Sequence, residues 1–279
     1  MHPFAVACVS FHVAGHPPLS MTRVEDVSPM TVLVIAGLLT FALTTLFSMA
    51  GVGAALILIP VFLAFGIELQ TAMATALLLN AVGMTVASVT FVRKGLVEWR
   101  LVLPMLVLAV GLSPVGVWAA HGMDRNLLLW LFVGFLVFAA AMMVWYQPTP
   151  RASRASLAAT LALGLPVGGA AGFIGGLLGV GGGNIILPAL VASGMEPKRA
   201  SASASFVVIF ASISGFLAHV QVARIDTALL VVTALATMAG AALGAWLATE
   251  HLSAAQLKRA IALVLIAVAL KTAWDLLRP

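Results

Sequence analysis

Charged residues are scarce in this sequence: Asp, Glu, Lys and Arg together make up only 8% of its 279 residues. A soluble domain carries about 25%, so this chain cannot cover a folded surface with water-facing groups. Apolar residues make up 62% instead, and this composition predicts an all-α polytopic membrane protein. The formal net charge of +5 rests on few groups. It does not indicate nucleic-acid binding and is typical of basic residues kept on the cytoplasmic face.

Groups that bind metals or perform catalysis are scarce as well. Cys8 is the only cysteine, which excludes an internal disulfide and a thiolate metal cluster. The sequence contains neither an HExxH motif nor a Ser/His/Asp arrangement for an intramembrane hydrolase. We therefore expect no metal, no cofactor and no enzymatic activity. No Asp or Glu lies in the middle of a long apolar segment, so a proton relay through buried carboxylates is not supported either.

The first 29 residues lack the features of a signal peptide. They have no basic region at the start, and their apolar stretch is interrupted by His12, Gly15 and the pair Pro17-Pro18. We interpret residues 1–29 as a disordered leader, with Met21 as a candidate start and a functional tail as the alternative.

Apolar segments separated by polar stretches follow from residue 30 onward. About 20 apolar residues are needed to cross a hydrocarbon core of about 30 Å. The pattern predicts eight to ten transmembrane segments, at residues 30–50, 53–65, 71–92, 101–120, 127–146, 157–178, 183–193, 201–220, 227–249 and 258–276. Segments 53–65 and 183–193 are too short, because at about 1.5 Å per residue they reach only about 16–20 Å.

The two short segments are counterparts in an internal repeat. A shift of 128 residues lays GVGAALILIPVFLAFGIELQTAMATA (51–76) over GVGGGNIILPALVASGMEPKRASASA (179–204). We predict two homologous halves, residues 30–146 and 157–279, joined by a polar linker at 147–156. Paired short, Gly/Pro-interrupted segments in two halves point to the binding site of a transporter. The breaks should face each other inside the protein, because lipid offers no hydrogen bonds to irregular backbone.

The number of crossings stays open between eight and ten. Eight follow if each short segment dips into the membrane without crossing it, and the halves are then parallel. Ten follow if the short segments cross, and then the halves are inverted and the N-terminus lies outside. Both arrangements divide the basic residues nine to five between two faces, so the preference of basic residues for the cytoplasmic side does not choose between them.

The glycine run GVGGGNIILP at 179–188 favours an anion site over a nucleotide loop. A dinucleotide fingerprint or a P-loop needs a preceding strand and a downstream lysine or acid, which are missing here. A helix break inside a membrane exposes unpaired backbone N–H groups at the positive end of the next helix, and such groups bind anions. Glycine lets a ligand approach closely, and Asn184 adds side-chain donors. The alternative is that the glycines only allow close helix packing, which we prefer for those between 164 and 176.

Further polar residues follow each break. Ser201 and Ser205 lie on one helical face, four residues apart, and Asn80 lies within an apolar span, where an amide should face protein or water. The predicted substrate-binding residues are Gly51, Gly53, Asn80, Gly179, Gly181, Gly182, Gly183, Asn184, Ser201 and Ser205, with Pro60 and Pro188 as structural breaks. His219 closes a span and could take up a proton near neutral pH, although a histidine at a boundary is usually solvated.

The element GVGxxxxxxP and its fuller form GLLGVGGGNIILPAL, which continues into ASASASFVVIFASISGF, resemble the TauE/SafE family of sulfite and organosulfur-anion exporters. The resemblance covers about residues 30–275. The first-half copy is degenerate, with Ala54, Ala55 and Leu56 where the second half has Gly182, Gly183 and Asn184. The resemblance implies a multi-pass permease of the bacterial inner (plasma) membrane that moves small anions such as sulfite, sulfonates or thiosulfate.

The leading hypothesis is a secondary transporter that works by alternating access around the paired breaks, with the two halves rocking against each other. Its partners would be a small inorganic or organosulfur anion and the lipid bilayer, with no nucleic acid, and a homodimer stays open. A gradient would supply the energy, because no nucleotide motif is present. The alternative is a membrane-embedded assembly or biogenesis factor without transport, in which the glycines serve packing alone.

Overall fold

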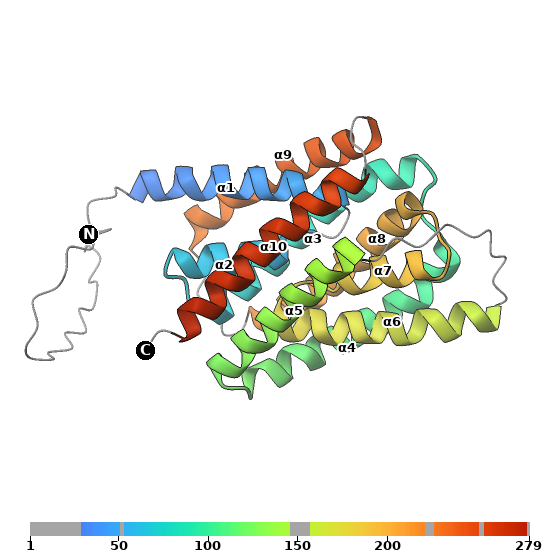
Figure 1. Cartoon of the computed structure of the whole chain (residues 1–279), viewed down its shortest axis with the longest axis horizontal. Coiled ribbons are helices and arrows are strands. Elements are labelled where there is room, and N and C mark those ends of the chain that lie inside the picture. The colour runs from blue at the N-terminus through green and yellow to red at the C-terminus, as the bar shows by residue number, and fades with distance from the viewer. Residues whose placement is uncertain (1–28, 51–52, 146–156, 221–225, 251–253, 278–279) are drawn as a thin grey trace, which may run out of the picture.

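The structure is a computed structural model that describes residues 29–50, 53–145, 157–220, 226–250 and 254–277. Within these ranges every regular element is a helix, and ten helices follow one another (Figure 1). They are α1 Pro29–Ala50, α2 Ala55–Ala64, α3 Leu69–Arg93, α4 Trp99–His121, α5 Arg125–Trp145, α6 Leu157–Leu178, α7 Gly183–Ala192, α8 Pro197–His219, α9 Thr227–Glu250 and α10 Ala254–Leu277. The predicted all-α fold is confirmed. Most of the predicted leader and the whole predicted linker lie outside the described residues.

Length and apolarity explain why these helices form. In lipid the backbone must satisfy its hydrogen bonds within the segment, so a long apolar run adopts a helix. Within the described part of the chain, seven helices are long and apolar enough to cross a membrane: α1, α3, α4, α5, α6, α8 and α9. The two short segments form α2 and α7, which have ten residues each and are therefore about 15 Å long. The chain is a multi-pass membrane protein that contains two helices of half the usual length.

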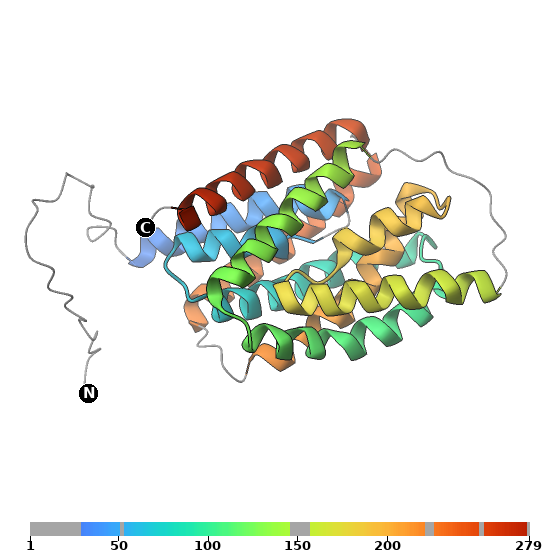
Figure 2. The ribbon, with the colours of Figure 1, turned by 60° about the horizontal axis from the view of Figure 1, so that its bottom comes forward.

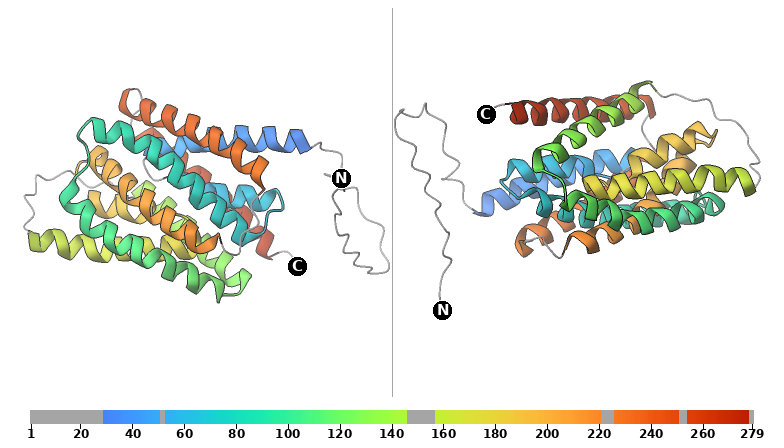
Figure 3. Two further views of the ribbon diagram at one scale, coloured as in Figure 1. Left: turned by 180° about the vertical axis from the view of Figure 1, so that it is seen from behind. Right: turned by 90° about the horizontal axis from the view of Figure 1, so that it is seen from below.

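Six long helices form one layer in the order α1, α9, α3, α8, α4 and α6. Figure 3 (left) shows α9, α3, α8 and α4 side by side, seen from behind. Helices α5 and α10 pack on each other over the other side of this layer, and Figure 2 shows α5 running obliquely across it. The short helices lie between, because α2 contacts both α3 and α10 and α7 contacts both α8 and α5. Each short helix has fully buried apolar side chains, such as Leu56 of α2 and Ile186 of α7.

The packing contacts group the layer and the short helices into two bodies of four helices. α1, α2, α3 and α9 form the first body, and α4, α6, α7 and α8 form the second. The two bodies meet where α3 packs on α8, and the pair α5–α10 spans both. Each body combines helices from both predicted halves, since α9 joins α1–α3 and α4 joins α6–α8.

Helices at corresponding positions of the predicted halves run in opposite directions. α6, α7, α8 and α9 begin 128 residues after α1, α2, α3 and α4. Arg199 in the first turn of α8 forms an ion pair with Glu98 just before α4. At the other ends of these two helices, His219 and His121 meet with ring centroids 5.4 Å apart. α8 is therefore parallel to α4 and antiparallel to α3, and Figure 1 likewise shows α1 beginning at the left and α6 at the right. These directions fit the inverted arrangement, while the division into homologous halves stays a prediction.

Glycines bring α6 into close contact with α4. A Cβ atom at Gly168 would lie 2.3 Å from the carbonyl oxygen of Met105, and one at Gly172 would lie 2.3 Å from that of Ala109. The next glycine on this face, Gly176, is equally tight, since its Cβ would lie 2.1 Å from a carbonyl oxygen of α4. Small residues at four-residue spacing allow this approach, in agreement with the packing interpretation of these glycines.

Candidate functional site

The first helix break lies between α1 and α2. Gly51 lies outside the described residues, while Gly53 has φ of +77°, a conformation that favours glycine. A Cβ atom at Gly53 would lie 2.0 Å from the side-chain oxygen of Asn80. Glycine is therefore required at position 53, both because φ is positive and because the amide of Asn80 approaches too closely for a side chain.

Asn80 connects the first break to the opposite body. Its side chain is 2% exposed in the middle of α3. Asn80 Oδ1 accepts a hydrogen bond from the backbone N–H of Ala55, the first residue of α2, at 3.4 Å. Asn80 Nδ2 donates to Ser212 Oγ on α8 at 3.0 Å. The amide thus caps the short helix on one side and crosses the interface between α3 and α8 on the other.

The second break, between α6 and α7, reaches the same two side chains. Gly179, Gly181 and Gly182 have φ values of +71°, +75° and +78°. A Cβ atom at Gly181 would lie 2.5 Å from Ser212 Oγ and 2.6 Å from Asn80 Nδ2. Both breaks therefore approach the hydrogen-bonded pair of Asn80 and Ser212, in the interior of the protein where the sequence predicted that they would face each other.

The other two glycines of the second break are held by neighbouring backbone and side chains. A Cβ atom at Gly179 would lie 2.8 Å from Met73 Cβ, and one at Gly182 would lie 2.4 Å from the carbonyl oxygen of Ala171. Gly182 is the N-cap of α7, and its carbonyl oxygen accepts hydrogen bonds from Ile185 and Ile186. A larger residue at position 179 would collide with Met73, and one at position 182 would collide with the backbone of Ala171.

Asn184 has the most unusual environment of the predicted site residues. It is the second residue of α7, directly after the buried Gly183, and its side chain is 2% exposed. Neither Oδ1 nor Nδ2 of Asn184 has a hydrogen-bond partner among the described residues. An unsatisfied buried polar group costs about 1–3 kcal/mol. The amide lies at the start of a helix, where the backbone N–H groups of Gly183 and Asn184 have no partner within the helix, so it marks a place suited to a polar ligand.

The predicted serines, Ser201 and Ser205, lie nearer the start of α8 than the residues of α8 that contact the second break. Ser205 Oγ donates a hydrogen bond to the carbonyl oxygen of Ser201 at 2.8 Å, as a serine does within its own helix. The residues of α8 that contact the second break are Val208 and Ser212, one and two turns further along. Ser212 was missed in the sequence analysis, although it follows Ser205 by seven residues and so lies on the same helical face.

The two prolines predicted as structural breaks lie inside the short helices. Pro60 and Pro188 are each the sixth residue of their helix, and α2 and α7 both continue past them. The backbone interruption comes before the helices, at the glycines. A proline inside a helix cannot donate to the residue four positions earlier, so Pro188 leaves the carbonyl oxygen of Asn184 without a helical donor.

The surroundings of the two breaks contain neutral donors rather than charges. α2 and α7 contain no charged residue, and the ion pair of Glu98 and Arg199 lies at the ends of α4 and α8. Within the described residues, no group of three or more His, Cys, Asp or Glu could hold a metal ion. The arrangement can thus bind an anion by backbone and side-chain N–H groups without a competing carboxylate.

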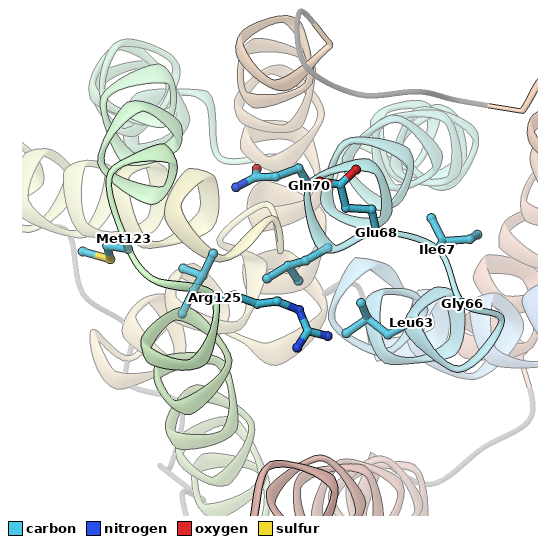
Figure 4. A pocket seen from close by; sticks show the side chains of 9 residues that line it. Leu63, Gly66, Ile67, Glu68, Gln70, Met123 and Arg125 are labelled. Atoms are coloured by element: carbon cyan, nitrogen blue, oxygen red, sulfur yellow. The ribbon is translucent and has the colours of Figure 1, made fainter. Parts of the chain in front are cut away.

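A separate cavity of about 390 Å³ opens at the end of the protein where α2 ends and α3 begins. Figure 4 shows Glu68 and Gln70 at the start of α3 and Arg125 at the start of α5. These three supply its polar lining, and the side-chain oxygen of Gln70 is buried without a hydrogen-bond partner among the described residues. Sequence analysis did not identify this cavity, because it depends on how two turns far apart in the chain come together.

A comparison with known protein families finds a match over most of the chain. Residues 35–272 match the family described as Sulfite exporter TauE/SafE. No curated protein and no solved structure matches the chain significantly. The match covers most of the chain, including both breaks and all ten helices in whole or in part. The chain therefore belongs to the sulfite exporter TauE/SafE family.

Proposed function

We propose that this protein is a secondary transporter of small sulfur oxyanions, such as sulfite, sulfonates or thiosulfate, in the bacterial inner membrane. The anion binds between the two helix breaks, at the start of α7. Membership of the TauE/SafE family supports transport of an anion, and the surroundings of the breaks support the binding site. The substrate class rests on the family, and the position of the site rests on the geometry.

The observation that carries the proposal is the buried amide of Asn184. Neither of its polar atoms has a hydrogen-bond partner among the described residues, and it lies at the start of α7, where the backbone N–H groups of Gly183 and Asn184 have no partner within the helix. The positive end of the helix dipole adds to these donors. An oxyanion accepting hydrogen bonds from Asn184 Nδ2 and from the backbone would remove the cost of the unsatisfied amide.

The two breaks play unequal parts in this proposal. At the first break, Asn80 already accepts the hydrogen bond of the first N–H of α2, so that helix start is occupied by the protein itself. At the second break the residue that corresponds to Asn80 is Val208, which offers no acceptor. The start of α7 is left for a ligand, and Asn80 contributes its amide from the side.

The proposed site lies at the interface of the two four-helix bodies, since Asn80 comes from α3 and Ser212 from α8. We propose that these two bodies move relative to each other in alternating access. The sequence halves are less suitable as moving units, because α1 packs on α9 and α4 packs on α6 across them. In the described conformation the site is closed, as the 2% exposure of Asn184 indicates.

The substitution Asn184→Leu tests the site. Leu56 occupies the corresponding position of α2 and is fully buried, so a leucine is compatible with this place in a short helix. We expect thiosulfate flux into proteoliposomes to fall at least about tenfold, because the amide donor is gone. The melting temperature in detergent should stay equal or rise, because an unsatisfied buried amide has been replaced by an apolar group.

Leu56→Met is the matched control, since this swap preserves volume and should keep the flux. Unchanged flux in Asn184→Leu would place the anion elsewhere. Loss of expression or folding in this variant would favour packing as the role of Asn184, as an assembly factor without transport would require. If wild-type protein moves neither sulfite, thiosulfate nor methanesulfonate under any gradient, the substrate class is wrong.

A further inference from the structure

His219 is buried at one end of the protein. It is the last residue of α8, its side chain is 0% exposed, and neither ring nitrogen has a hydrogen-bond partner among the described residues. The sequence analysis expected a histidine at a helix boundary to be solvated, and here the structure differs. The reason is that α3, α4, α6 and α7 all pack on α8, and the ring of His219 lies on a covered face of this helix, whereas Leu217 is exposed.

Among the described residues, an ionisable side chain of another helix contacts His219. The ring of His121, at the end of α4, lies edge-on to it with centroids 5.4 Å apart and an angle of 88° between the planes. His121 is exposed, so it connects the buried ring to water.

The helices around His219 carry few other ionisable groups. α6 and α7 contain none, and the only others on α3, α4 and α8 are Arg93, Arg100, Lys198 and Arg199, all at the opposite end of the bundle. At the same end as His219, Glu68 precedes α3, and Asp124 and Arg125 follow α4, all three at the surface. His121 is therefore the group through which His219 would exchange a proton.

The ring of His219 also lies next to the second helix break. The ring lies beside the backbone of Gly176, in the last turn of α6. Val180 donates a hydrogen bond to the carbonyl oxygen of the adjacent Gly175 at 2.8 Å. A Cβ atom at Gly175 would lie 2.7 Å from the backbone nitrogen of Gly182. A few residues of tightly packed backbone thus separate His219 from the start of α7.

Three helices end around this ring, namely α4 at His121, α6 at Leu178 and α8 at His219 itself. The negative ends of helix dipoles favour a positive charge on the ring, whereas burial of the ring disfavours one. A bound anion nearby would offset this cost of burial, so the imidazole would take up a proton together with the anion.

From this arrangement we propose that His219 is the proton-binding site that couples anion movement to a proton gradient, with His121 as its connection to water. This inference rests on the proposed transport function. His121 accepts a proton from water at the surface. A rotation of the rings that brings a nitrogen of His121 within hydrogen-bond distance of His219 then passes the proton on, which returns His121 to the neutral form. The positive charge on His219 then lies close to the start of α7, so proton binding and anion binding strengthen each other and the two move in the same direction.

The experiment measures thiosulfate binding and proton uptake on the purified wild-type chain. Thiosulfate stays fully ionised across the range in which histidine titrates, about pH 5 to 8, so its own charge does not contribute. We expect the affinity to rise at least about fivefold from pH 8 to pH 5.5, as is typical of coupled sites. Addition of thiosulfate to a weakly buffered solution should cause proton uptake. Binding without proton uptake and with equal affinity at both pH values would overturn the inference.

Variants then assign the effect to this site. In His219→Gln we expect pH-independent affinity and loss of thiosulfate flux driven by a pH difference, while exchange of labelled for unlabelled thiosulfate persists. His121→Gln should slow the response to a pH difference without abolishing it at equilibrium. Lys271→Gln, an exposed position on α10, is the control and should behave like wild type. A normal pH dependence in folded His219→Gln would refute the assignment.

The two proposals fail in different ways. If the wild-type protein transports no anion at all, the proposed function fails and the coupling site fails with it. If the wild-type protein exchanges thiosulfate but ignores a proton gradient, only the role of His219 is wrong. Should His219→Gln not fold, the proton-uptake measurement on the wild-type chain still decides.

Discussion

At the scale of single residues, two glycines of the breaks meet two requirements at once: a positive φ and the absence of a side chain. Gly53 and Gly181 both have positive φ, and a side chain on either would collide with Asn80. Gly66 has φ of +80° as well, but a Cβ atom there would meet nothing within 4 Å. Glycine is therefore needed at positions 53 and 181 both for the backbone conformation and for the close approach of Asn80. At position 66 it is needed only for the backbone conformation of the turn between α2 and α3.

This difference predicts unequal effects for the same substitution. Gly66→Ala should cost roughly 1–2 kcal/mol, the penalty of a left-handed conformation for a residue with a Cβ. Gly53→Ala should cost more and should also reduce transport, because it displaces Asn80 from the first N–H of α2. Thermal unfolding in detergent and thiosulfate flux would be measured on both variants. Equal losses of stability with unchanged flux would show that the contact with Asn80 has no functional role.

At the scale of helices, the sequence predicted where elements begin and end better than what they touch. Segments 53–65 and 183–193 became α2 and α7 with bounds moved by two residues at most, since apolar length and flanking glycine are local properties. The hydrogen bond between Asn80 and Ser212 joins residues 132 positions apart, and the contact of His121 with His219 depends on α4 and α8 lying parallel. No local pattern carries such information, so the hydrogen bond of Ser212 with Asn80 and the buried state of His219 could not be predicted.

The glycine face of α6 gives a prediction at this scale. Gly172→Ala should destabilise the protein by about 1–3 kcal/mol, as overpacking does, because its Cβ would lie 2.3 Å from the carbonyl oxygen of Ala109 on α4. Gly111→Ala on α4 itself should be neutral or stabilising, because nothing lies within 4 Å and alanine favours a helix over glycine by about 1 kcal/mol. Melting temperatures of the two variants in detergent test this. A stable Gly172→Ala would mean that α4 and α6 lie further apart than described.

The corresponding face of α1 uses hydroxyl groups instead. Thr40, Thr44 and Ser48 stand where α6 has Gly168, Gly172 and Gly176, and all three are buried. The close approach between α1 and α9 comes from Gly240 and Gly244 of α9, which lie against the backbone of Phe41 and Thr45. The helix pairs α1–α9 and α4–α6 thus both pack tightly through glycine. Gly116 and Gly244 stand at equivalent positions of the predicted repeat, whereas the other glycines do not, so tight packing is kept with little sequence similarity.

At the scale of the whole molecule, the charges of the two ends differ. The end where α3 finishes and α4 and α8 begin carries, among described side chains, five basic and two acidic residues: Arg93, Lys94, Arg100, Lys198 and Arg199 against Glu98 and Glu196. The opposite end, where His121 and His219 meet and where Figure 1 places the C-terminal end of α10, carries two basic and four acidic residues: Arg125 and Lys271 against Glu68, Asp124, Asp226 and Asp275. Basic residues stay preferentially on the cytoplasmic side, so the end with the two histidines should face outward.

Thiol labelling tests this orientation in a Cys8→Ser background, since Cys8 is the only native cysteine. Lys94→Cys and Asp124→Cys introduce exposed thiols at the two ends. A membrane-impermeant maleimide applied to intact spheroplasts should label position 124, and position 94 only after the membrane is opened. The outward position would give His121 direct access to protons on the acidic side of the membrane, so that the gradient drives anion uptake by way of His219. The reverse labelling pattern would place both histidines on the cytoplasmic side, and a proton gradient of the usual sign would then oppose uptake by this route.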